Sequence, residues 1–221
     1  MKPSETPLEL ILATRNLKKK AEMLRLIQPD WEPNERLARL SILTLEDFAD
    51  VPEVVEDADS FLGNARKKAA ETARFLKRWV LADDSGLAVD ALQGAPGVHS
   101  ARYSGVHGDD QANNQKLLLA LADLPDSRRG AAFVCALALA DPTGSIRLET
   151  EGSCRGVITR EPRGSRGFGY DPLFLIPEYH RTFGELSALT KHQLSHRSRA
   201  FARLRAGLEK IGVDSFGSRP E

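Results

Sequence analysis

Two adjacent carboxylates, Asp83 and Asp84, lie within the otherwise apolar stretch VLADDSGLAV at residues 80–89. Like charges beside a protein core repel each other and lose hydration, so the pair requires open water or a cation. The simpler interpretation is a polar turn between two strands, because Asp-Asp-Ser-Gly is also a common turn composition.

A second group of polar residues follows the apolar run at 8–13. The segment 14–16, Thr-Arg-Asn, precedes a helical pattern, and the free backbone N–H groups and the dipole at the start of a helix attract anions. Lys19 lies one turn further along and could direct its ammonium group toward the same anion. The lysines at 18–20 could instead form a solvated helix face. The chain has no GxxxxGK[ST] sequence, which excludes a P-loop nucleotide site.

Basic residues recur in the segment KHQLSHR at 191–197, where two helices are expected to meet. The donors of Lys191, His196 and Arg197 could bind the edge of a purine or clamp phosphates. Alternatively, Ser195 caps the last helix and leaves the next two residues exposed in its first turn. Cations there oppose the helix dipole, which favours a bound anion.

Two aromatic residues in the loop GFGYDP, at 167–172, supply a further candidate contact. The rings of Phe168 and Tyr170 could stack on a base. Equally, they could fill a hydrophobic turn, so the loop alone does not decide between a binding role and a structural one.

Strands and helices alternate along the chain and must position these residues. Apolar spacing predicts helices over 14–27, 61–76, 110–122 and the last stretch, which contains Phe201, Leu204, Leu208 and Ile211. The residues expected to cap the first two helices are Thr14, Asn16 and Ser60. Strands are expected over 8–13, 79–82, 87–91, 131–140, 145–154 and 155–159, with a hairpin turn at 141–144 and an acidic loop at 44–59.

This alternation predicts an α/β fold. No repeat or linker separates independent domains, so we expect a single elongated domain with a central mixed β-sheet flanked by helices, and two lobes around a substrate cleft. The domain is expected to span 8–213, after a flexible N-terminal lead at 1–7 and before a C-terminal tail at 214–221.

The charges of the chain cancel, since it has 31 lysine and arginine residues and 31 aspartate and glutamate residues. No net field attracts a polyanion, so any anion site is local and no nucleic-acid partner is expected. Cys135 and Cys154 have neither CxxC spacing nor a disulfide-framework pattern, which suits reduced thiols and a cytoplasmic location. No signal-peptide pattern or membrane-length apolar run is present, so no membrane association is expected.

Several segments occur in an order typical of one enzyme family: ATRNLKKKAE, FLGNARKKA, LADDSGLAVDALQGAPGVHSARYSG, NNQKLL, GFGYDPLF and KHQLSHRSRA. Between Leu10 and Leu208 the chain resembles the inosine/xanthosine triphosphate pyrophosphatase family. The resemblance implies a homodimeric house-cleaning enzyme that uses Mg²⁺ to hydrolyse deaminated purine nucleoside triphosphates (ITP, dITP and XTP) to the monophosphate and pyrophosphate.

The resemblance also implies roles for individual residues. Those that match the family's phosphate-binding positions are Thr14, Asn16, Lys19 and Lys68. Glu56 and Asp84 match its metal-binding carboxylates, and Asp84 also matches its proton acceptor. The residues that match its sugar- and base-binding positions are Ser85, Phe168, Gly169, Tyr170, Asp171, Lys191, His196 and Arg197.

Two positions depart from the family pattern. Arg15 stands where a glycine is common, and this could alter how closely a triphosphate approaches the loop. Gly63 stands where an acidic residue often precedes Asn-Ala, and this could remove an auxiliary metal or water contact.

The implied chemistry accounts for the acidic pair. Mg²⁺ is commonly held by one or two carboxylates together with phosphates and water, so Glu56 and Asp84 are a suitable complement. The metal ion and lysines would stabilise the departing pyrophosphate, while Asp84, or Asp83 beside it, orients or deprotonates the attacking water. A pocket of donors would favour the C6 carbonyl of hypoxanthine and xanthine over the amino group of adenine.

Three alternatives remain at this stage. A septum-formation-related nucleotide pyrophosphatase would have a different base preference, and a purine-nucleotide-binding sensor would bind triphosphates without turnover. A single-stranded nucleic-acid binder is opposed by the zero net charge.

Overall fold

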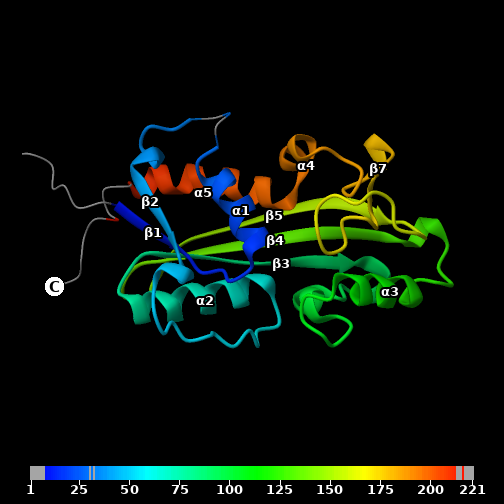
Figure 1. Cartoon of the computed structure of the whole chain (residues 1–221), viewed down its shortest axis with the longest axis horizontal. Helices are drawn as coiled ribbons and strands as arrows, with labels where there is room; N and C mark the ends of the chain where they lie inside the picture. The colour runs from blue at the N-terminus through cyan, green and yellow to red at the C-terminus, as the bar shows by residue number, and fades with distance from the viewer. Residues whose placement is uncertain (1–7, 30, 32, 213–215, 217–221) are drawn as a thin grey trace, which may run out of the picture. The chain divides into compact units, whose positions relative to one another are not determined.

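The computed structural model of the chain describes residues 8–29, 31, 33–212 and 216 (Figure 1). The lead expected at 1–7 and, apart from residue 216, the tail expected at 214–221 lie outside the described residues. The chain divides into two compact units, of which the first contains residues 1–84, 136–151 and 200–221 and the second contains residues 85–135 and 152–199.

Among the described residues, seven strands form one sheet in the order β2-β1-β3-β4-β5-β6-β7. Their bounds are Leu8–Leu12 for β1, Leu40–Thr44 for β2, Val80–Val89 for β3, Gly130–Ala140 for β4, Ile146–Ile158 for β5, Phe174–Ile176 for β6 and Arg181–Thr182 for β7. Strand β1 pairs in parallel with β2 and β3, whereas β6 pairs antiparallel with β5 and β7. The expected mixed sheet of an α/β fold is therefore confirmed.

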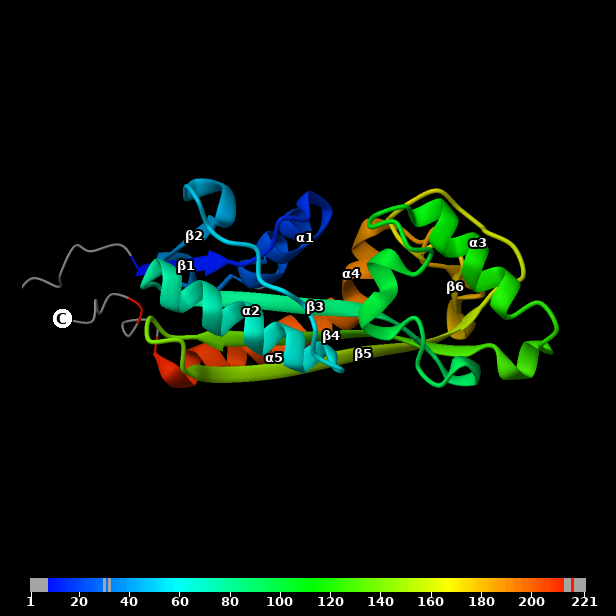
Figure 2. The ribbon, with the colours of Figure 1, turned by 90° about the horizontal axis from the view of Figure 1, so that it is seen from below.

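Five α-helices accompany the sheet in the described part of the chain: α1 (Leu17–Ile27), α2 (Phe61–Leu76), α3 (Asp110–Ala120), α4 (Ala188–Leu194) and α5 (His196–Ile211). In the first unit, α2 covers one face of the sheet, and most of α5 lies on the opposite face (Figures 1 and 2). None of the described helices is both long enough and apolar enough to cross a membrane.

Each unit has its own hydrophobic core. In the first unit, the alanines on one face of α2 pack against alanines and larger aliphatic residues of β1, β3 and β4. In the second unit, Phe133, Phe174 and Phe183 pack together, with ring centroids 4.6 to 5.9 Å apart. Small side chains bring a helix close to the sheet, whereas the aromatic cluster fills a larger volume.

The expected helix caps are present. The side-chain oxygen of Asn16 accepts the N–H of Lys19 at 3.1 Å, and Ser60 Oγ accepts the N–H of Gly63 at 3.1 Å. At the last helix, Ser195 Oγ accepts the N–H of Ser198 at 3.2 Å. These contacts satisfy N–H groups that have no partner within the first turn of a helix.

Two expectations about strands are wrong. The acidic pair does not lie in a turn, because 79–82 and 87–91 belong largely to the single strand β3. Likewise, the two strands expected over 145–159 form the single strand β5. In addition, strands β2, β6 and β7 were not expected. Charged residues and glycines interrupt the apolar pattern of β3 and β5, and so the sequence suggested a break in each strand. The strands continue because neighbouring side chains point to opposite faces of the sheet, where each can contact a different partner.

Candidate active site

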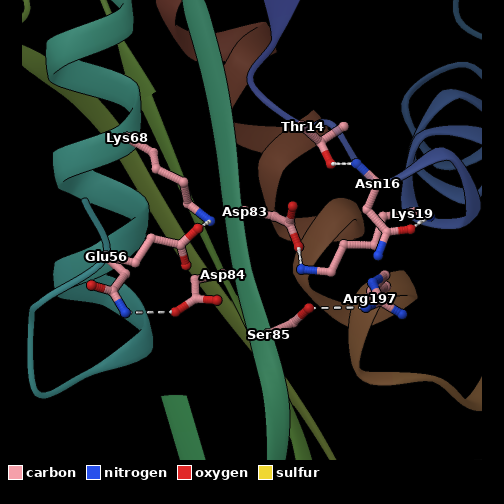
Figure 3. A network of polar contacts seen from close by, with 10 residues as sticks. Thr14, Asn16, Lys19, Glu56, Lys68, Asp83, Asp84, Ser85 and Arg197 are labelled. Carbon is pink, nitrogen blue, oxygen red and sulfur yellow. Dashed lines mark hydrogen bonds and ion pairs between the residues drawn. The ribbon is translucent and has the colours of Figure 1, made fainter. Parts of the chain in front are cut away.

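The two adjacent carboxylates lie on opposite faces of β3, because consecutive side chains of a strand alternate. Asp83 accepts a hydrogen bond from Lys19 Nζ at 3.0 Å, and Asp84 accepts one from the side-chain amide of Asn64 on α2 at 3.0 Å. Figure 3 shows Asp83 directed toward Lys19 and Asp84 directed toward the side of Glu56. Separate partners therefore offset the repulsion expected from the sequence.

The first basic group begins at the end of β1. The Thr14 hydroxyl accepts the N–H of Asn16 at 3.2 Å. The Asn16 side chain then caps the first turn of α1 by accepting the N–H of Lys19. Lys19 pairs with Asp83, whose side chain is only 2% exposed. An ammonium group has three donors, so a lysine that holds a carboxylate can bind a phosphate oxygen at the same time.

The second lysine faces the other carboxylates. Lys68 Nζ on α2 lies 3.3 Å from a carboxylate oxygen of Glu56, and the Glu56 side chain points toward Asp84 (Figure 3). Burial raises the pKa of Asp84, and the charge of Glu56 raises it further. The charges of Lys68 and Lys19 and the hydrogen bond from Asn64 act in the opposite direction. The pKa of Asp84 is thus subject to opposing effects of burial and of neighbouring charges, a situation that is common among general bases.

Asn64 is a site residue that the sequence analysis missed. Its amide nitrogen donates to Asp84, and its amide oxygen accepts the N–H of Ala58 at 2.9 Å. The residue is completely buried and so connects the loop that carries Glu56 to strand β3. The available signal was an amide side chain next to the alanines on the buried face of α2.

The two departures from the family pattern also have structural counterparts. The Arg15 guanidinium donates to the carbonyl of Val51 at 2.6 Å and so contacts the same acidic loop. A Cβ atom on Gly63 would lie 2.8 Å from the Cβ atom of Ala58 and 3.0 Å from Ser60 Oγ. The described loop therefore leaves no room for a larger residue at position 63.

In the second unit, cations surround the aromatic ring of the GFGYDP loop. Lys191 Nζ lies 5.1 Å and Arg197 Cζ lies 5.3 Å from the centroid of the Phe168 ring. Arg197 also donates to Ser85 Oγ at 2.9 Å (Figure 3). The ring and the two cations present stacking and hydrogen-bonding groups of the types that bind a purine.

Asp171 anchors this arrangement. One carboxylate oxygen accepts hydrogen bonds from Lys191 Nζ at 2.5 Å and from the N–H of Phe168 at 2.8 Å. Burial raises the pKa of Asp171, against the lowering effect of Lys191 and of this N–H. Asp171 can orient Lys191 and the backbone of Phe168, because one of its carboxylate oxygens accepts a hydrogen bond from each of them.

Two of the expected contact residues pack against the aromatic core of the second unit. Tyr170 is 3% exposed, and its hydroxyl donates to the carbonyl of Ser100 at 2.9 Å. The expectation that the Tyr170 ring stacks on a base is therefore wrong, because core residues cover it. His196 is also 3% exposed and stacks on Phe133 with centroids 4.9 Å apart, so the alternative of an exposed His196 is wrong as well.

The structure thus brings the expected residues together in two groups. In the first unit, Asp84 lies with Glu56, Lys68 and Asn64, while Asp83 holds Lys19. In the second unit, the expected residues with direct mutual contacts are Ser85, Phe168, Asp171, Lys191 and Arg197. Fold and side chains together define an α/β protein with paired carboxylates and lysines in one unit and a cation-rich aromatic group in the other.

Comparison with known proteins makes the assignment more specific. Residues 10–207 match the model of the Ham1 family, and the chain belongs to that family. A relative from Rhodopirellula baltica named dITP/XTP pyrophosphatase is 56% identical over 87% of this chain and 88% of its own length. A relative of the same name from Geobacter sulfurreducens is 47% identical over 93% of this chain and 98% of its own length.

Solved structures agree with this assignment. A HAM1 protein from Coxiella burnetii is 40% identical, with a TM-score of 0.81 over 92% of this chain and 99% of that one. The Ham1 protein of Staphylococcus aureus is 35% identical, with a TM-score of 0.80 over the same shares of the two chains.

Proposed function

We propose that this protein is a Mg²⁺-dependent pyrophosphatase that hydrolyses ITP, dITP and XTP to the nucleoside monophosphate and pyrophosphate. The relatives named dITP/XTP pyrophosphatase support the reaction and the substrate class. The observation that carries the proposal is the environment of Asp84, which lies with a second carboxylate and under the influence of two lysines. Oxygen ligands for a cation and donors for a polyphosphate are present in one unit.

The metal is part of the proposal. Among the described residues, no group of three or more His, Cys, Asp or Glu side chains could enclose an ion. Mg²⁺ does not need such a group, because phosphates and water usually complete its octahedral shell. The oxygen atoms of Glu56 and Asp84 fit this requirement and would hold the ion. When bound, Mg²⁺ would neutralise charge on the phosphates during cleavage.

The protein's own groups perform the remaining steps. Lys19 and Lys68 bind phosphate oxygens and stabilise the negative charge that develops on pyrophosphate, with help from N–H groups at the start of α1. Asp84 accepts a proton from the attacking water. In the metal-free protein, burial raises the pKa of Asp84, so its carboxylate is a stronger base there than that of an exposed aspartate.

The second unit supplies the groups for the base. Phe168 stacks on the purine, and Lys191 and Arg197 donate to its C6 carbonyl and to the sugar or phosphate. Adenine presents an amino group at C6 and would leave these donors unmatched, which costs about 1 to 3 kcal/mol for each buried donor. Buried His196 supports the arrangement through its contact with Phe133.

The state of the protein in the cell also belongs to the proposal. We expect a homodimer in the cytoplasm, as the family resemblance and the cysteine pattern imply. Size-exclusion chromatography with light scattering would report the dimer, and a monomer at working concentrations would contradict it.

A pyrophosphate-release assay tests the proposal. ITP, XTP, GTP and ATP are supplied with and without Mg²⁺, and we expect release from ITP and XTP that depends on the metal. Equal turnover of all four nucleotides would remove the proposed selectivity. Binding of XTP without release of pyrophosphate would favour the nucleotide sensor instead.

A further inference from the structure

One face of α3 contacts the loop that carries Phe168. The N–H of Gly169 donates to the carboxylate of Asp110 at 2.9 Å, and the carbonyl of Gly169 accepts from the amide nitrogen of Asn114 at 3.0 Å. Both backbone polar groups of one loop residue are therefore bound by side chains of a single helix. Asn114 belongs to the NNQKLL segment, to which the sequence assigns no role.

The spacing of the two side chains explains the contact. Asp110 and Asn114 are four residues apart, so they lie on the same face of α3, one helical turn from each other. An acceptor and a donor at this separation can hold the N–H and the C=O of one peptide segment at the same time. A donor in place of the Asp110 carboxylate would face the N–H of Gly169, and an acceptor in place of the Asn114 amide nitrogen would face its carbonyl oxygen.

The helix itself is firmly held. Asp109 caps it by accepting the N–H of Ala112 at 2.9 Å, and Leu117 is buried in the core of the second unit. At the other end, the buried Arg129 donates to the carbonyl of Leu121 at 2.6 Å. Side chains on this helix can therefore fix a neighbouring loop.

The loop needs such a support because its two glycines allow the backbone many conformations. Gly167 and Gly169 have φ angles of +79° and +61°, a region that glycine enters without strain. The two residues flank Phe168, whose half-buried ring lies near Lys191 and Arg197. Without external bonds, the glycines would allow the ring to take several orientations.

We propose that Asp110 and Asn114 are positioning residues that fix the Phe168 ring for stacking on the purine. The inference rests on the proposed function, because it needs a purine nucleotide as substrate. These residues act on base recognition and leave the binding of the polyphosphate unchanged, since the lysines of the first unit perform that task.

The variant Asn114→Asp tests the proposal, since it keeps the shape of the side chain but turns a carboxylate oxygen toward the Gly169 carbonyl. Loss of one hydrogen bond lowers kcat/KM for XTP roughly five- to tenfold, mainly through KM. The inhibition constant of inorganic tripolyphosphate, which has no base, stays unchanged. Gln115→Glu is the matched control, because it makes the same chemical change at an exposed position of α3.

Hydrogen exchange gives a readout that does not need turnover. Amides of residues 167–171 should exchange faster in Asn114→Asp than in Gln115→Glu, while the rest of the second unit exchanges as in the wild type. Should Asn114→Asp fail to fold, Asp110→Ala removes the other bond and should give the same pattern.

The outcomes separate the two proposals. An equal loss for XTP and tripolyphosphate, or unchanged exchange at 167–171, overturns the role of Asp110 and Asn114. A wild-type protein that releases no pyrophosphate from XTP contradicts the proposed function, and the exchange measurement still decides whether α3 holds the loop.

Discussion

Asp84 combines a cost in stability with the chemical role that we propose for it. Burial and the charge of Glu56 raise its pKa, and two lysines and an amide act against this rise. A carboxyl whose pKa is higher in the folded state binds more protons when folded than when unfolded. Stability therefore falls as the pH rises from the ordinary value of 3.8 through the folded-state pKa.

The variant Asp84→Asn removes this ionisation. We expect its Tm without metal to exceed that of the wild type at neutral pH, because no charge is then buried, and the difference to vanish below the ordinary carboxyl pKa. Thermal unfolding followed by circular dichroism at several pH values measures both effects. A lower Tm at neutral pH would show that the charge of Asp84 stabilises the fold.

Asn64→Ala should affect activity through Asp84. Loss of the amide removes a hydrogen bond that lowers the pKa of Asp84, so the acidic limb of the kcat/KM profile moves to higher pH. Partners that orient such carboxylates typically contribute about 10- to 100-fold to activity or metal affinity. The control is Glu71→Ala at an exposed position of the same helix. A reduced rate with an unshifted pH profile would contradict this role.

At the scale of elements, a buried arginine joins a helix to a strand. Arg129 is 2% exposed and donates to three backbone carbonyls, those of Leu121 after α3 and of Ile158 and Thr159 at the end of β5. Burial lowers the pKa of its guanidinium. The planar group has donors in several directions, so one side chain can satisfy three acceptors.

Arg129→Leu should therefore lower the free energy of unfolding by about 3 kcal/mol or more, since three buried carbonyls lose their donor. Arg129→Lys should recover part of the loss, because a single ammonium group reaches fewer of these acceptors. Urea unfolding measures both variants. Unchanged stability in Arg129→Leu would mean that water replaces the guanidinium.

Local signals predicted the helices, whereas contacts distant in sequence determined the strands. The caps at Asn16, Ser60 and Ser195 could be found because they act within one turn of their helix. The continuity of β3 could not, since Asp83 and Asp84 are accommodated by partners from α1 and α2. For the same reason Asn64, Asp110 and Asn114 escaped notice.

Across the molecule as a whole, two units with separate cores each carry one group of candidate site residues. The first unit holds the carboxylates and lysines, and the second holds the aromatic and cationic groups for a base. Strand β3 passes from one unit to the other between Asp84 and Ser85. The sequence indicated both groups, but only the structure shows that Tyr170 and His196 pack against the core of the second unit.

The balanced charge of the molecule leads to a prediction about its ligands. With 31 basic and 31 acidic residues, the protein should not bind single-stranded DNA at physiological salt, because affinity for a polyanion requires a field over many phosphates. Fluorescence anisotropy with a labelled oligonucleotide measures this. Salt-dependent binding would instead support the single-stranded nucleic-acid binder.

The decisive measurement is pyrophosphate release from XTP by Asp84→Asn, compared with the wild type at saturating Mg²⁺. We predict a near-complete loss of rate, about 1,000-fold or more, in a folded variant, because the water then has no base and the metal loses a ligand. A variant that keeps the wild-type rate would contradict the role of Asp84 on which the account depends.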